Sequence, residues 1–143
     1  MPTLKTYDIF ISHAWKYGED YDRLVRLLNN ANNFSFRNYS APSEKPLQNL
    51  NLSPAHTSQE ILSAIERKIA PVNAVLVISG MYYNHREWMQ KEIEIAQRYN
   101  KPIIAIRPWS MLSPTPKAIS DASKTVVHWN TQSIVDAIRE YSL

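Results

Sequence analysis

The residue whose position most suggests chemistry is Glu92, which interrupts the apolar face of an expected helix. With about 100° between successive helical residues, one arc of this helix carries Trp88, Met89, Ile93, Ile95, Ala96 and Tyr99. The opposite arc carries Gln90, Lys91, Glu94, Gln97 and Arg98. A carboxylate within the apolar arc is costly to bury unless it is paired, hydrogen-bonded or facing a cavity. Glu92 is therefore either the partner of a cation, such as Arg86 or a lysine of another element, or a site carboxylate.

A second group of candidate residues stands where two expected buried strands end. The side chains at the end of the first strand are Ser12, His13, Ala14 and Trp15. Those at the end of the third strand are Ser79, Tyr82 and Tyr83. Ligands of open α/β sheets bind outside the carboxyl ends of the strands. The aromatic rings therefore form a stacking site for a planar ligand, or they cap the core and hold loops in place.

Several catalytic classes are excluded by residue types that are missing or rare. The 143-residue sequence contains no Cys, which removes thiolate catalysis, disulfides and Cys-based zinc sites. Its only glycines are Gly18 and Gly80, so neither GxGxxG nor a Walker A loop can be formed. The four histidines lack HxH and HExxH spacing, and no GxSxG nucleophile motif is present. We expect neither a metal ion nor a resident cofactor.

Charge and hydropathy argue against nucleic-acid and membrane partners. The net charge of +3 comes from 16 basic and 13 acidic residues scattered along the chain, without the basic patch that nucleic-acid binding requires. No apolar run approaches the roughly 20 residues of a membrane span, and the N-terminus lacks the apolar segment of a secretory signal. The hydrophobic share of 44% is typical of a packed globular domain. We expect a single domain over 1–143, located in the cytoplasm.

Strands and helices are expected to alternate along the chain. The expected strands are 7–12, 34–39, 74–79, 102–106 and 125–127. Amphipathic helices are expected over 20–30, 57–69, 84 to about 99, and from 130 onward. The second and third of these helices open on a capping pattern, Thr57 with Glu60 and Asn84 with Glu87. Pro-rich loops are expected at 40–56 and after the fourth strand.

This alternation predicts the α/β fold class. Parallel strands joined by right-handed crossovers place helices on both faces of the sheet. We therefore expect a flavodoxin-like three-layer sandwich with a five-stranded parallel sheet in the order 2-1-3-4-5. The strand at 34–39 alternates polar and apolar residues, which predicts an edge position. The run at 74–79 is continuously apolar up to its final serine, as in a strand covered on both faces.

Three segments resemble Toll/interleukin-1 receptor (TIR) domains, and in particular the bacterial TIR-like proteins of Thoeris antiphage systems. YDIFISHAW at 7–15 is similar to the first TIR box. LVISGMYYNHREWMQKEIEIA at 76–96 is similar to the strand, aromatic loop and Trp-x-x-x-Glu helix of the family. PIIAIRPW at 102–109 is a weaker likeness. The segment 40–56 is longer and richer in Pro than the usual TIR loop and lacks its glycine, which argues against receptor-adaptor signalling through it.

The resemblance implies cleavage of NAD+ between nicotinamide and ribose, with NAD+ as the substrate. Glu92 would be the catalytic carboxylate, and Trp88 would stack on a ring of the substrate. The other substrate-binding residues would be Ser12, His13, Ala14, Trp15, Ser79 and Tyr82. Glycosidases need a second carboxyl group to protonate the leaving oxygen. Nicotinamide leaves as a neutral molecule from a cationic bond, so one carboxylate can suffice.

The resemblance also implies partners. In Thoeris systems the product becomes a cyclic or conjugated ADP-ribose second messenger that activates a separate effector. Self-association on activation and a phage-derived trigger are expected with it, as is low activity without that trigger. The alternative is a catalytically silent TIR-like module that works by self-association or by binding a nucleotide or protein. A flavin-binding protein is disfavoured, because the segment after 7–12 lacks a Ser/Thr/Gly-rich phosphate pocket.

Overall fold

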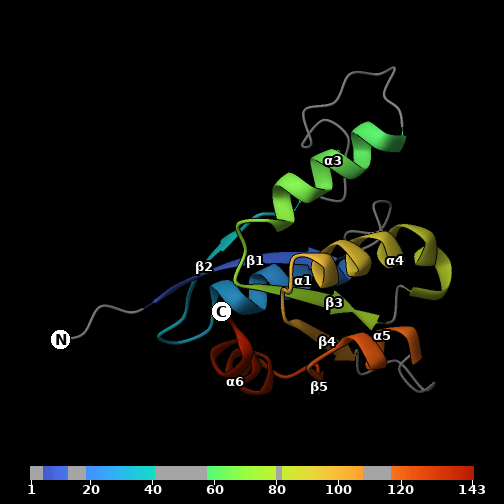
Figure 1. Ribbon diagram of the computed structural model, residues 1–143. Helices are drawn as coiled ribbons and strands as arrows, with labels where there is room; N and C mark the ends of the chain where they lie inside the picture. Colours follow the sequence, from blue (N-terminus) through green and yellow to red (C-terminus); the bar gives the residue numbers. More distant parts are fainter. Residues whose placement is uncertain (1–4, 13–18, 41–57, 80–81, 108–116) are drawn as a thin grey trace.

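The computed structural model describes residues 5–12, 19–40, 58–79, 82–107 and 117–143 (Figure 1). Within these residues the strands are β1 (Thr6–Ser12), β2 (Ser35–Asn38), β3 (Ala74–Ile78), β4 (Ile103–Arg107) and β5 (Thr125–His128). The helices are α1 (Glu19–Asn29), α3 (Ser58–Ile69), α4 (Tyr82–Arg98), α5 (Lys117–Ala122) and α6 (Thr131–Tyr141).

The described strands form one parallel sheet in the order β2-β1-β3-β4-β5. This is the predicted order, and it confirms the predicted fold class. β1 pairs with β2 from Thr6 opposite Ser35 to Ile9 opposite Asn38. On its other side β1 pairs with β3 as far as Ser12 opposite Val77. The two strands predicted to carry candidate residues at their ends are therefore neighbours.

Burial follows the position of each strand in the sheet. Every residue of β3 is buried, as its uninterrupted apolar sequence predicts. β4 is buried up to its last residue, Arg107. The edge strands β2 and β5 are short and mostly half-buried or exposed. β2 thus lies at the edge, as its alternating sequence predicts.

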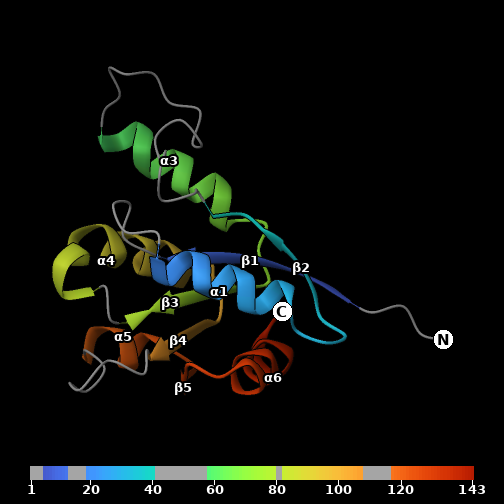
Figure 2. The ribbon, with the colours of Figure 1, turned by 180° about the vertical axis from the view of Figure 1, so that it is seen from behind.

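Helices cover both faces of the sheet. α1 packs beside α6, and α4 contacts both α3 and α5. Figure 1 shows α4 in front of the sheet, and the opposite view in Figure 2 shows α1 in front. α6 begins after Asn130, whose side chain accepts a hydrogen bond from the backbone N–H of Ser133 at 3.0 Å. Asn130 is thus the N-cap of this helix, which begins one residue after the predicted start at 130.

Two helical predictions need correction. α4 begins at Tyr82, so the pattern at Asn84 lies inside the helix and does not mark its start; nothing in Tyr82 and Tyr83 opposes helical geometry. α4 also ends before Tyr99, which is 39% exposed rather than part of the apolar face. The helix α5 was not predicted, because six residues with one buried side chain, Ile119, show no period. No helix among the described residues is long and apolar enough to cross a membrane.

Candidate functional site

Ser12 and Ser79 lie at the carboxyl edge of the sheet, at the ends of the neighbouring strands β1 and β3. Ser12 is the last residue of β1, and Ser79 directly follows β3. Both are fully buried. Because successive side chains of a strand point to opposite faces, Phe10 and Ser12 share the face that α4 covers, and Ile9 and Ile11 share the other. Ser12 therefore places a buried hydroxyl on the α4 side at the end of β1.

Glu92 on α4 meets Ser12. The Ser12 hydroxyl donates a hydrogen bond to Oε1 of Glu92 at 2.8 Å. Glu92 is only 2% exposed, and its helical neighbours Met89 and Ile93 are buried in the core. The helix therefore presents the carboxyl group to the sheet together with its apolar face, as the sequence periodicity predicts. Among the described residues, no other hydrogen bond to the carboxyl group is found.

The environment of Glu92 favours the neutral acid. Burial raises its pKa from 4.5 to about 8, and the hydrogen bond from Ser12 acts in the opposite direction. No lysine or arginine in the described part of the chain forms a salt bridge with it. With no cation beside it among the described side chains and a pKa of about 8, the acid is mostly protonated at pH 7. The side chain of Arg86, the partner considered from the sequence, lies outside the described side chains.

Ser79 has a backbone partner. Its hydroxyl donates a hydrogen bond to the carbonyl oxygen of Ile106 in β4 at 3.1 Å. This bond ties the end of β3 to the neighbouring strand at the carboxyl edge. Ser79 thus lies where a substrate-binding residue was predicted, and its hydroxyl also helps to hold the edge together.

The remaining predicted site residues are placed only in part. Tyr82 is the first residue of α4, and Trp88 lies on the same helix four positions before Glu92, which is about one turn. The side chains of Tyr82 and Trp88 are outside the described ones. The predictions for His13, Ala14 and Trp15 fall outside the described residues altogether.

Sequence reasoning missed a second polar cluster, made of the buried side chains of Tyr21 and Ser40 and the exposed Asn38. Tyr21 is 5% exposed and Ser40 is 7% exposed. The Asn38 side chain donates a hydrogen bond to the Tyr21 hydroxyl at 2.6 Å, and the Ser40 hydroxyl accepts one from the backbone N–H of Ile11 at 2.5 Å. These partners come from α1, β1 and the end of β2. No local spacing reveals contacts between residues 17 and 29 positions apart.

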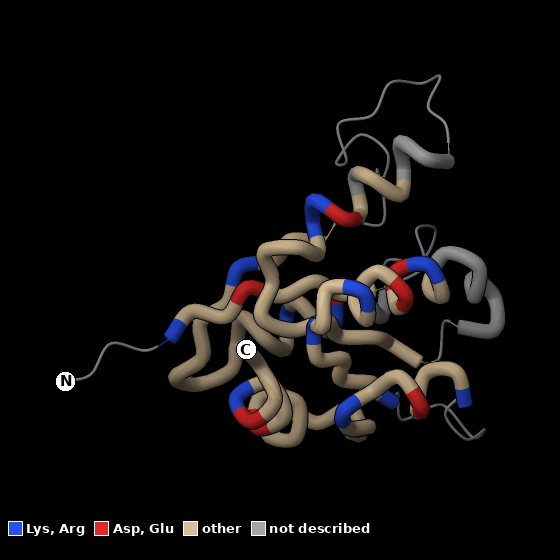
Figure 3. The backbone as a smooth tube through the Cα atoms, viewed as in Figure 1, with Lys and Arg blue, Asp and Glu red and all other residues tan. Residues whose placement is uncertain are grey.

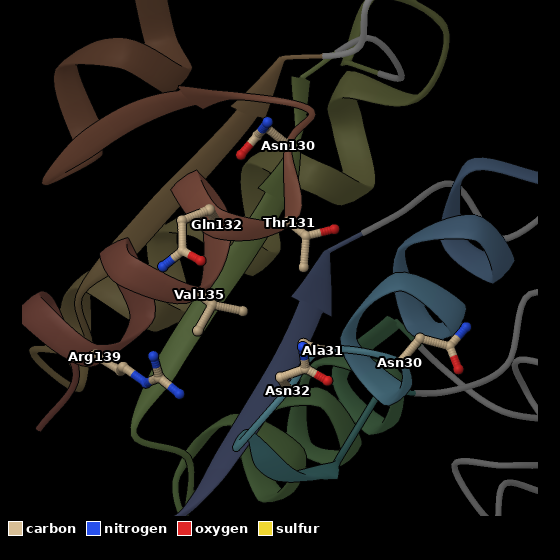
Figure 4. A pocket seen from close by; sticks show the side chains of 8 residues that line it. All are labelled: Asn30, Ala31, Asn32, Asn130, Thr131, Gln132, Val135 and Arg139. Carbon is tan, nitrogen blue, oxygen red and sulfur yellow. The ribbon is translucent and has the colours of Figure 1, made fainter.

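A pocket of about 360 Å³ lies on the opposite side of the sheet, between α6 and the end of α1 (Figure 4). Its lining residues are Asn30, Ala31, Asn32, Asn130, Thr131, Gln132, Val135 and Arg139. None of them is a predicted site residue. Because α1 and α6 pack together on one face and α4 lies on the other, this pocket is separate from Glu92.

The electrostatics of the described surface are mixed. Each of α1, α3, α4 and α6 carries basic and acidic residues (Figure 3). Among the described residues, no group of three or more His, Asp or Glu side chains could hold a metal ion.

A parallel sheet in this order, with an acidic residue buried behind β1, is the arrangement expected of a TIR-like domain. The family model for the Thoeris protein ThsB, TIR-like domain, matches residues 10–113. The chain belongs to this family and is a TIR-like protein of antiphage defence. The match runs from β1 past β4 and includes Ser12, Ser79 and Glu92. No curated protein matches the chain.

Proposed function

We propose that this chain cleaves NAD+ between nicotinamide and ribose, with Glu92 as the catalytic carboxylate. The observation that carries the proposal is a buried carboxyl group that has a serine as hydrogen-bond donor and no cation among the described residues. A structural ion pair would satisfy the burial of Glu92 from within the protein. No cation among the described residues does so, and the pyridinium ribosyl group of NAD+ carries a positive charge.

The reaction uses the charge of the carboxylate. As the bond between C1′ and the nicotinamide nitrogen breaks, both electrons go to nitrogen and positive charge develops on the ribose. Ionised Glu92 stabilises that charge, which is the electrostatic term that dominates many enzymatic rate enhancements. Ser12 holds Oε1 in place, and Oε2 accepts a ribose hydroxyl. The cationic substrate lowers the pKa of the acid as it binds.

The second half of the reaction needs a nucleophile. Water attacks C1′ and gives ADP-ribose, or a hydroxyl or base nitrogen of the same or another molecule attacks and gives a cyclic or conjugated ADP-ribose. An attacking O–H group loses a proton, which the Glu92 carboxylate accepts. A base with a pKa of about 8 is suited to this task near neutral pH. The product is the second messenger, read by a separate effector protein.

The proposed active form is an assembly that responds to a phage-derived trigger. In the isolated chain Glu92 is mostly neutral at pH 7, which favours low basal activity. A neighbouring protomer completes the site and raises turnover. We therefore expect the specific activity to rise with protein concentration. A high specific activity that is constant on dilution contradicts the assembly and leaves the role of Glu92 intact.

The test is incubation of the purified protein with NAD+, with and without lysate of phage-infected cells, followed by mass spectrometry of nicotinamide and of ADP-ribose products. Glu92→Gln is the variant, and Glu94→Gln is its matched control on the exposed side of the same helix. We expect products from the natural chain and from the Glu94 variant only. Nucleotide binding without turnover in every condition assigns the chain to the catalytically silent class.

A further inference from the structure

A side-chain hydrogen bond joins the carboxyl end of β1 to the segment that follows β2. Within the described residues, the backbone N–H of Tyr39 donates to the carbonyl of Ile9 at 2.9 Å. Two residues further along β1, the N–H of Ile11 points to the same edge. It donates a hydrogen bond to the Ser40 hydroxyl. A serine side chain thus satisfies a buried N–H, which would be costly to leave unpaired.

Ser40 is itself held by two other side chains. Its backbone N–H donates a hydrogen bond to Oδ1 of Asn38 at 2.9 Å, and a side-chain hydrogen bond joins it to Tyr21. Asn38 in turn donates to the Tyr21 hydroxyl. Tyr21 lies on α1, and its side chain packs in the hydrophobic core. The three residues are therefore joined to one another by hydrogen bonds, and Ser40 extends this network to the backbone of Ile11.

That bond acts on the residue next to Ser12. The backbone N–H of Ile11 is held by Ser40 on the β2 side, and Ser12, the next residue, is in register with Val77 on the β3 side. The Ser12 side chain points toward α4 and meets Glu92. If the Ser40 bond is removed, the end of β1 loses one of the bonds that hold it. The distance between the Ser12 hydroxyl and Glu92 then varies.

We propose that Tyr21, Asn38 and Ser40 are positioning residues that fix the end of β1, so that the Ser12 hydroxyl is held against Glu92. The effect of these three residues on NAD+ turnover rests on the proposed function. Their effect on the hydrogen bond between Ser12 and Glu92 is independent of that function and can be measured without substrate. None of the three was predicted as a site residue, and none contacts Glu92 itself.

The test is a titration of Glu92 in the ligand-free protein, followed by NMR of its labelled carboxyl carbon. Ser12→Ala removes a bond that lowers the pKa of Glu92, so the midpoint should rise by about one unit. Ser40→Ala should shift the midpoint in the same direction by a smaller amount. The double variant should match Ser12→Ala alone, because both changes act through one bond. Exchange of the Ile11 amide should accelerate in Ser40→Ala.

Ser123→Ala is the matched control, since Ser123 donates a half-buried hydrogen bond to the carbonyl of Ile119 far from β1. It should lower stability and leave the midpoint unchanged. Ser40→Thr keeps the hydroxyl and should restore the natural midpoint. If Ser40→Ala does not fold, Tyr21→Phe carries the test, because it removes only the hydroxyl. A folded Ser40→Ala or Tyr21→Phe with the natural Glu92 midpoint overturns the proposal, whether or not the chain cleaves NAD+.

Discussion

The hydroxyl of Ser12 lies 2.8 Å from Oε1 of Glu92, although the two residues are 80 positions apart in the chain. Ser12 is the last residue of β1, and Glu92 lies on α4, which packs against β1. A buried acid with a neutral donor and no described cation keeps its proton at neutral pH. Its free energy of ionisation is therefore high in the free protein and falls when a cation binds. The following predictions depend on this relationship.

Glu92→Gln separates catalysis from stability. The amide keeps the size of the side chain and removes the charge, so NAD+ cleavage should fall by about 10²–10³-fold, as for other groups that stabilise developing charge. The free energy of unfolding should stay equal or rise, because the acid has no cation to lose among the described residues. Urea unfolding and product yield per folded molecule give both values. A variant that is strongly destabilised and retains its product yield contradicts the assignment.

The raised pKa of Glu92 also predicts how stability depends on pH. Between about 4.5 and 8 the folded chain holds a proton on Glu92 that the unfolded chain has released. Stability from this group is complete below that window and is lost as the pH rises through it, by about 1.4 kcal/mol per pH unit for one proton. Glu92→Gln lacks this loss, so its stability relative to the natural chain should increase with pH across the window.

Unfolding curves of both proteins at several pH values measure this difference. Glu94→Gln is again the control, because an exposed carboxylate should leave the difference constant. A stability gap between the natural chain and Glu92→Gln that does not change over the window means that Glu92 is ionised in the folded protein. The ion-pair interpretation would then regain support.

The sheet could be predicted from sequence because its signals are local. An unbroken apolar run such as 74–78 fits a strand buried on both faces, and the alternation around Phe36 fits an edge. The position of Glu92 followed from helical periodicity alone. The resemblance to TIR-like domains added the family, which the comparison confirms.

The contacts that define the site could not be predicted, because they join distant parts of the chain. Nothing in the sequence near Ser40 indicates that its hydroxyl bonds the backbone of Ile11. Tyr21 has the spacing of a core residue, and its ring is in the core, but its hydroxyl belongs to a polar network. Likewise, the sequence left open whether Glu92 pairs with a cation or is a site carboxylate. Its described hydrogen-bond partner is a serine.

Trp88 should contribute to turnover through its ring. If it stacks on the substrate, Trp88→Ala should abolish NAD+ cleavage and Trp88→Phe should retain part of it, because both aromatic faces can stack. Trp129→Ala is the comparison, since Trp129 packs against the core from the other end of the chain. It should lower the melting temperature without changing activity per folded molecule. If the activity of both Trp88 variants simply follows their folded fraction, Trp88 is a core residue.

The pH dependence of the reaction should report Glu92 directly. Only the ionised carboxylate stabilises the ribosyl cation, so kcat/KM should rise with pH and level off above a midpoint near 8, the value expected for the free protein. The midpoint of kcat should be lower, because the bound pyridinium favours the ionised acid. Ser12→Ala removes a bond that favours ionisation, so its kcat/KM midpoint should move to higher pH. Initial rates measured between about pH 6 and pH 9, with folding checked at each point, decide the matter. A kcat/KM that is constant over this range, or a midpoint unchanged in Ser12→Ala, would show that Glu92 is not the group whose ionisation controls turnover.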